Sequence, residues 1–81
     1  MQKIGLLAGA GRLPVEFARA ACGMGFTVTA IAVVSGTDSE LPTVADQLYT
    51  INAGELDKII TTLQQEGISE VTMIGKVTKE L

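Results

Sequence analysis

Residues 3–14 read KIGLLAGAGRLP, and this stretch decides the fold. Lys3 to Ala8 form a short, nearly continuous apolar run, which is typical of a strand buried on both faces of a parallel sheet. The run stops at Gly9-Ala10-Gly11. Pro14 then suits the first turn of a helix, where its missing N–H group would have no partner anyway. A strand, a tight glycine turn and a helix in this order indicate an α/β protein.

Three further stretches downstream of this unit predict strands. Residues 26–34 (FTVTAIAVV) are rich in β-branched residues and predict the second strand. Residues 47–51 predict a short third strand, and residues 70–74 predict a fourth.

Two longer helices are expected, from about Pro14 to Gly23 and from Glu55 to Glu66, with one short turn near residues 43–46. Glycines follow both helices, and Gly25 suits the left-handed cap of the first. Helical spacing predicts that each helix turns one apolar stripe toward the sheet: Leu13, Phe17, Ala20, Ala21 and Met24 in the first, and Leu56, Ile59, Ile60 and Leu63 in the second.

The resulting order is β-α-β-β-α-β, which calls for a mainly parallel sheet with right-handed crossovers. We therefore expect a small, three-layer, Rossmann-like α/β domain whose four strands lie in the order 3-2-1-4. A chain of 81 residues makes one domain at most.

The composition excludes several classes of function. Six basic and nine acidic residues give no basic face of the kind that nucleic acid requires. The chain has no His and a single cysteine, Cys22, so neither a disulfide nor a Cys/His metal site is possible. No stretch reaches the roughly 20 apolar residues that span a bilayer. We expect a cytoplasmic protein and leave homo-oligomers open.

A ligand site is expected where the strand order reverses, beyond the carboxyl ends of strands 1 and 4. Two glycine turns, Gly9 to Arg12 and Gly75-Lys76, would face each other there across a crevice. Glycines let a backbone approach a ligand, helix N–H groups attract anions, and the two cations would add charge. The alternative is a purely structural strand-to-helix turn.

Dinucleotide and catalytic sites are less well supported. Pro14 stands where the third glycine of the dinucleotide fingerprint belongs, and no acidic residue ends strand 2. Asp38 and Glu40, in the loop after strand 2, could touch a metal or a hydroxyl group, or form a solvated turn. With no histidine to activate Ser35, no acid, base and nucleophile can be assembled. The residues therefore indicate a binding domain and not a complete enzyme.

The chain resembles the LpxI-type UDP-2,3-diacylglucosamine pyrophosphatases of lipid A biosynthesis over nearly all its length. The resemblance rests on the opening IGLLAGAGRLP (residues 4–14) and the ending VTMIGKV (residues 71–77), with GFTV (25–28) and Ala45-Asp46 between them. It implies that residues 1–81 are the N-terminal, substrate-binding domain, and that the family's C-terminal catalytic domain is absent.

This resemblance also implies a reaction for the parent family, which hydrolyses UDP-2,3-diacylglucosamine to UMP and lipid X with the help of Mg²⁺. The 81-residue chain alone is expected to bind no metal, to hold no catalytic residue and to be inactive. Its expected partners are the UDP-linked acylated glucosamine or its phosphate product, and the C-terminal domain. The resemblance also implies the inner face of the inner membrane as an alternative position to the cytoplasm. The substrate-binding residues expected are Gly9, Ala10, Gly11, Arg12, Leu13, Gly75, Lys76 and Val77.

Two other functions stay open beside this one. The chain could be a non-catalytic nucleotide- or phosphate-binding module, or a half-domain that only docks a partner.

Overall fold

The computed structural model describes residues 2–76, and within them the chain forms four strands and three helices. The first strand has the bounds that the opening stretch predicts, since β1 runs from Lys3 to Ala8, and α1 begins at Leu13, one residue before the predicted start. In chain order the elements are β1 (Lys3–Ala8), α1 (Leu13–Gly23), β2 (Thr27–Ala32), α2 (Leu41–Val44), β3 (Gln47–Thr50), α3 (Leu56–Gln65) and β4 (Val71–Ile74).

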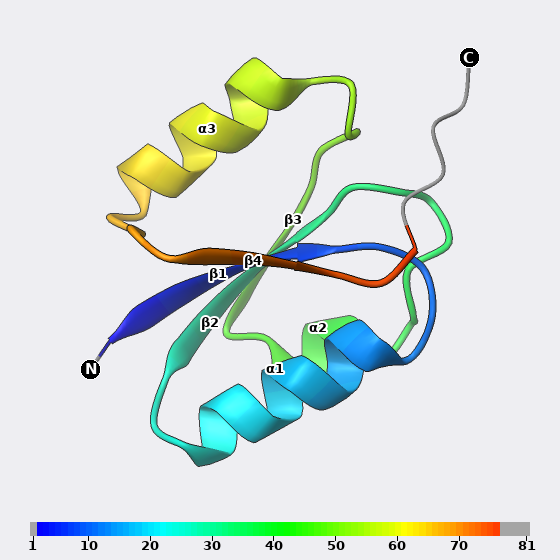
Figure 1. Ribbon diagram of the computed structural model, residues 1–81, viewed down its shortest axis with the longest axis vertical. Helices are drawn as coiled ribbons and strands as arrows, with labels where there is room; N and C mark the ends of the chain where they lie inside the picture. Colours follow the sequence, from blue (N-terminus) through cyan, green and yellow to red (C-terminus); the bar gives the residue numbers. More distant parts are fainter. Residues whose placement is uncertain (1, 77–81) are drawn as a thin grey trace.

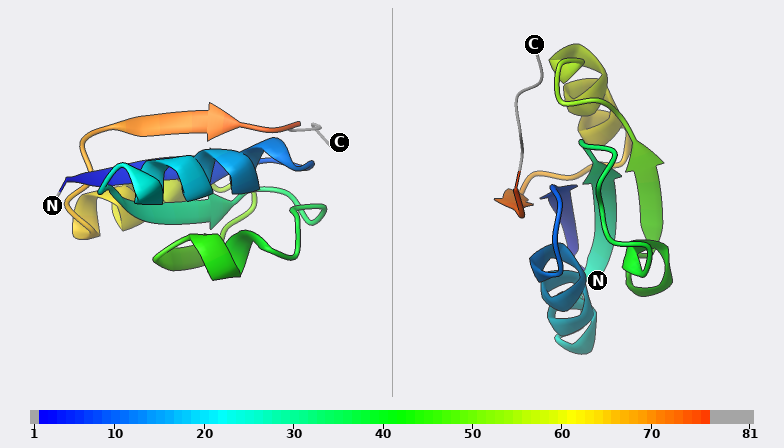
Figure 2. Two further views of the ribbon diagram at one scale, coloured as in Figure 1. Left: turned by 90° about the horizontal axis from the view of Figure 1, so that it is seen from below. Right: turned by 90° about the vertical axis from the view of Figure 1, so that its right-hand side faces the viewer.

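The four described strands form one parallel sheet in the order β3-β2-β1-β4, which confirms the expected α/β fold and its strand order. β1 lies in the centre, where Leu6 pairs with Ala30 of β2 on one side and with Thr72 of β4 on the other. Helices α1 and α2 cover one face of the sheet and α3 covers the other, as Figures 1 and 2 show. Because the four described strands are parallel, their carboxyl ends lie at one edge of the sheet.

The core between the sheet and α1 is built from small aliphatic side chains, as the composition requires. Leu6, Val15 and Val28 are completely buried, and Leu41 of α2 closes the same cluster. Because most of these side chains are small, α1 packs close to the sheet.

The stripe expected for α1 is right at Phe17 and Ala21, which pack into the core. It is wrong at Ala20, which is exposed, and at Leu13 and Met24, which are 63% and 76% exposed. The helix is rotated about its axis so that a smaller set of residues faces the sheet. The short turn between β1 and α1 fixes this rotation, and the residues that α1 buries are Pro14, Val15, Ala18 and Ala21.

The stripe expected for α3 is right at Ile59 and wrong at two positions. Ile59 is 3% exposed and packs with Ile31 and Val33, whereas Leu56 and Ile60 are 59% and 45% exposed. Seen along the strands, α3 leaves β4 uncovered on its side of the sheet (Figure 2).

Left-handed glycines end both longer helices, as expected. Gly25 has a φ of 91°, and its N–H group donates to the carbonyl of Cys22 at the end of α1. Among residues 2–76, no helix is long and apolar enough to cross a membrane.

Candidate functional site

The two glycine turns at the reversal of strand order are in direct contact. The N–H group of Ala10 donates to the carbonyl of Lys76 (2.8 Å), and the N–H group of Lys76 donates to the carbonyl of Ala10 (3.0 Å). The N–H group of Gly9 donates to the carbonyl of Ile74 (2.9 Å). The turn after β1 and the turn after β4 are therefore one hydrogen-bonded unit.

Gly9 and Gly75 make this contact possible because a side chain at either position would collide with the opposite backbone. A Cβ atom on Gly9 would lie 2.5 Å from the carbonyl oxygen of Lys76, and one on Gly75 would lie 2.9 Å from that of Ala10. The expected crevice between the turns is therefore wrong, since the turns pack backbone against backbone. The N–H groups of Gly9, Ala10 and Lys76 bond to protein carbonyls and are not available to a ligand.

The outer side of the joined turns has more room. Gly11 has a φ of 103°, which favours glycine, and a Cβ atom added there would meet nothing within 4 Å. Leu13 begins α1, and in residues 2–76 its N–H group has no hydrogen-bond acceptor. Lys76 is exposed, and Val77 lies outside the described residues. Gly11, Leu13 and Lys76 are all exposed and follow the carboxyl ends of β1 and β4 in the chain.

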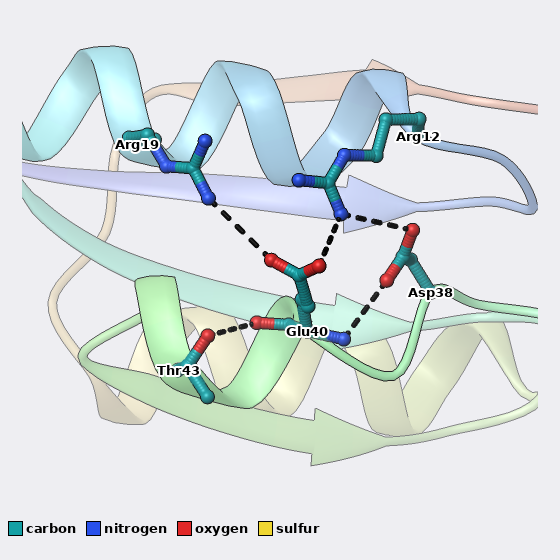
Figure 3. Close-up of polar contacts among 5 residues, drawn as sticks. All are labelled: Arg12, Arg19, Asp38, Glu40 and Thr43. Atoms are coloured by element: carbon teal, nitrogen blue, oxygen red, sulfur yellow. Dashed lines mark hydrogen bonds and ion pairs between the residues drawn. The ribbon is translucent and has the colours of Figure 1, made fainter.

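The guanidinium group of Arg12 is held by two carboxylates from the loop after β2 (Figure 3). Its Nη1 atom lies 2.8 Å from Oε1 of Glu40 and 3.5 Å from Oδ2 of Asp38. The hydrogen bond that Arg12 donates to Glu40 raises the pKa of Arg12 and lowers the pKa of Glu40. Arg12 supplies the positive charge expected at this turn, but Glu40 and Asp38 neutralise it.

Further contacts hold this loop in place. Asp38 accepts a hydrogen bond from the N–H group of Glu40 (2.9 Å), which is the main cause of its lowered pKa. Arg19, two turns along α1, approaches the other carboxylate oxygen of Glu40 at 3.5 Å (Figure 3). Gly11 and Thr37 form a bridge between the loop after β2 and the glycine turn.

Sequence reasoning did not foresee the pairing of Arg12 with Asp38 and Glu40. A signal for it exists, because β1 and β2 are adjacent parallel strands that end at the same edge. Opposite charges in the two loops that follow them are then expected to meet.

The described residues do not fit a resident Mg²⁺ ion. In residues 2–76, no three Asp, Glu, Cys or His side chains are arranged to hold a metal. The nearest approach is the pair Asp38 and Glu40, and Arg12 balances both. Cys22 is also a poor ligand or nucleophile, because desolvation and the nearby Asp46 raise the pKa of its thiol.

An open concavity of about 280 Å³ lies at the opposite end of the sheet, beside the first residues of β1 and β4. Its lining includes positively and negatively charged side chains, and Nζ of Lys3 donates a hydrogen bond to the carbonyl of Glu66. It is remote from the glycine turns and contributes nothing to them.

The comparisons with known proteins agree with the fold. No curated protein matches the chain. The family model of the LpxI N-terminal domain matches residues 3–81, which is almost the whole sequence. The match includes the strand–glycine-turn–helix unit and the Gly75-Lys76 turn that contacts it. The chain therefore belongs to the LpxI N-terminal domain family.

Proposed function

We propose that this chain is the substrate-binding part of a metal-dependent UDP-2,3-diacylglucosamine pyrophosphatase, and that it holds the phosphate end of the lipid-linked sugar. Family membership supports the choice of ligand. The observation that carries the site is the backbone contact between the turns at Ala10 and Lys76, which brings Lys76 beside the turn that precedes α1. Open α/β sheets bind ligands at this kind of position, where the strand order reverses.

Three groups would hold a phosphate on the outer side of the joined turns. The N–H group of Leu13 points out of the first turn of α1, where the helix dipole favours an anion. Arg12 uses only Nη1 for Glu40 and Asp38, so Nη2 and Nε can form a fork on phosphate oxygens. Lys76 adds a mobile charge from β4. Gly11 leaves space for the ligand between them.

Hydrolysis would require residues beyond this chain. Cleavage of the pyrophosphate to UMP and lipid X needs a group to activate water and charge to stabilise the transition state. The described residues offer neither an acid–base pair nor a metal site. We assign these, with Mg²⁺, to the C-terminal domain of the parent enzyme, and expect no turnover when the 81-residue chain is given substrate and Mg²⁺.

A titration of backbone amide NMR signals tests the proposed ligand. Lipid X, UMP and inorganic phosphate are added separately, and the amides of residues 9–13 and 75–77 are followed. Shifts that saturate at a lower concentration of lipid X than of phosphate support the proposal. Equal shifts with any phosphate would favour the second candidate, a general phosphate-binding module. The described residues are compatible with this candidate too, because they offer no acid–base pair for catalysis and Arg12 is paired with carboxylates. Absence of any shift would contradict both.

Arg12, at the N-cap of α1, and Arg19, within the helix, provide a matched pair of variants for this titration. Both contact Glu40, but only Arg12 borders the glycine turn. Arg12→Gln is expected to weaken lipid X binding about tenfold, because a charge-assisted hydrogen bond is lost. Arg19→Gln is expected to change it less than about twofold. Equal losses in both variants would contradict a direct contact from Arg12.

A further inference from the structure

The cation at the proposed phosphate site is already neutralised by the protein. Arg12, Asp38, Glu40 and Arg19 form one cluster of two cations and two carboxylates, whose formal charges cancel (Figure 3). About half of the Arg12 and Glu40 side chains is exposed, so water can reach the pair and the contact can break.

The carboxylates approach Arg12 from one side. Both Glu40 and Asp38 contact Nη1, while no other contact of the guanidinium exists within residues 2–76. A phosphate placed on Nη2 and Nε would therefore lie on the far side of the same planar group, a few ångströms from two negative charges. Charges of one sign at this separation repel measurably even in water.

We propose that Glu40, assisted by Asp38, competes with the ligand for the charge of Arg12 and sets the affinity of the site for anions. This inference rests on the proposed function. Glu40 holds Arg12 in place when no ligand is present and weakens the binding of weakly charged anions. The phosphate monoester of lipid X carries nearly two negative charges at neutral pH, so it can still compete for the guanidinium.

The direction in which Glu40→Gln changes the affinity for phosphate separates this role from its alternatives. Glu40→Gln removes the charge and keeps the size of the side chain. If Glu40 competes for Arg12, this variant binds inorganic phosphate and lipid X more tightly, by about three- to tenfold. If Glu40 only orders the loop, or grips the ligand through a hydroxyl group or a metal ion, the variant binds more weakly.

Two further variants complete the experiment. Glu16→Gln removes the same charge from the exposed first turn of α1, where Glu16 has no ion pair within the described chain. It is expected to change the affinity less than about twofold, and an equal gain in both variants would overturn the competition by showing a net-charge effect. Asp38→Asn keeps the oxygen that accepts the Glu40 N–H group and is expected to give a smaller gain, because Asp38 lies farther from Nη1.

The measurements are the amide titrations above, together with the Nε–H signal of Arg12. In Glu40→Gln without ligand this side-chain signal should broaden or shift, because the guanidinium loses its main partner. If the signal changes and the wild type binds phosphate, but Glu40→Gln binds no more tightly, the inference is overturned and the proposed function stands. If neither protein binds any phosphate, both the proposed function and this inference are contradicted.

Discussion

Gly9→Ala tests the contact that joins the two glycine turns. Gly9 has no positive φ, so alanine fits its backbone conformation and the effect of the substitution is steric. The new Cβ atom would lie 2.5 Å from the carbonyl oxygen of Lys76 and 2.8 Å from the carbonyl carbon of Gly75. Both neighbours are backbone atoms and cannot rotate away. The turn after β4 must therefore move by about 1 Å, since ordinary contacts begin near 3.4 Å.

The loss of stability follows from the hydrogen bonds that this movement breaks. The two hydrogen bonds between Ala10 and Lys76 contribute about 1 kcal/mol each, and residual overpacking adds about 1 kcal/mol or more. We expect a loss of about 3 kcal/mol in the free energy of unfolding. For a domain of this size that lowers the melting temperature by roughly 12–24 °C. Urea unfolding of the 81-residue chain, followed by far-UV circular dichroism, measures the change.

Gly23→Ala is the matched control for this measurement. Gly23 is the last residue of α1, and a Cβ atom added there would meet nothing within 4 Å. Alanine should leave the stability unchanged or raise it by up to about 1 kcal/mol, because it lowers the entropy of the unfolded chain. A Gly9→Ala protein within about 0.5 kcal/mol of the wild type would refute the close approach of the turns.

Two further predictions concern packing and charge. Ile59→Ala should cost about 2–4 kcal/mol in urea unfolding and Ile60→Ala less than about 1 kcal/mol, because only Ile59 is buried; equal costs would contradict the orientation of α3. The folded protein lowers the pKa of Asp38, mainly through the backbone N–H group of Glu40, and the pKa of Glu40, mainly through Arg12. These contacts therefore stabilise it above about pH 4.5, and their contribution is lost as the pH falls through the lowered values. Thermal melts across this pH range should show a smaller fall in melting temperature on acidification for Glu40→Gln than for the wild type. Parallel plots of melting temperature against pH would show that the pairing with Arg12 does not form.

The strand order could be predicted from the sequence because each step depends on local patterns and general rules. The bounds of β1 are those expected from its apolar run, and β2 is the β-branched core of residues 26–34. Right-handed crossovers then leave few ways to arrange four strands. The rotation of the helices was harder to predict. In α1 only Glu16 and Arg19 are charged, so hydrophobic spacing alone allows several faces to meet the sheet.

The candidate site could be located from sequence but its charge state could not. The reversal of strand order places the turns after β1 and β4 side by side, and the structure has them there. Whether Arg12 is free depends on how the loop after β2 folds back, and that path is set by the bridge between Gly11 and Thr37. Arg12 and Asp38 are 26 positions apart, so no local pattern reveals their pairing, and only the predicted strand order could suggest it.

The glycines of the opening stretch therefore need two separate explanations. Gly9 and Gly75 are required by the backbone contact between the turns, whether or not a ligand binds, so their presence is no evidence for a phosphate site. Gly11 differs, because its left-handed conformation faces open space and no packing neighbour demands a small residue there. Binding of phosphate must be judged from the groups around Gly11: the N–H group of Leu13, the free edge of Arg12 and the charge of Lys76. A Gly9 variant tests the contact between the turns, whereas Arg12 and Glu40 variants test ligand binding. Loss of stability in the first therefore gives no information about binding in the others.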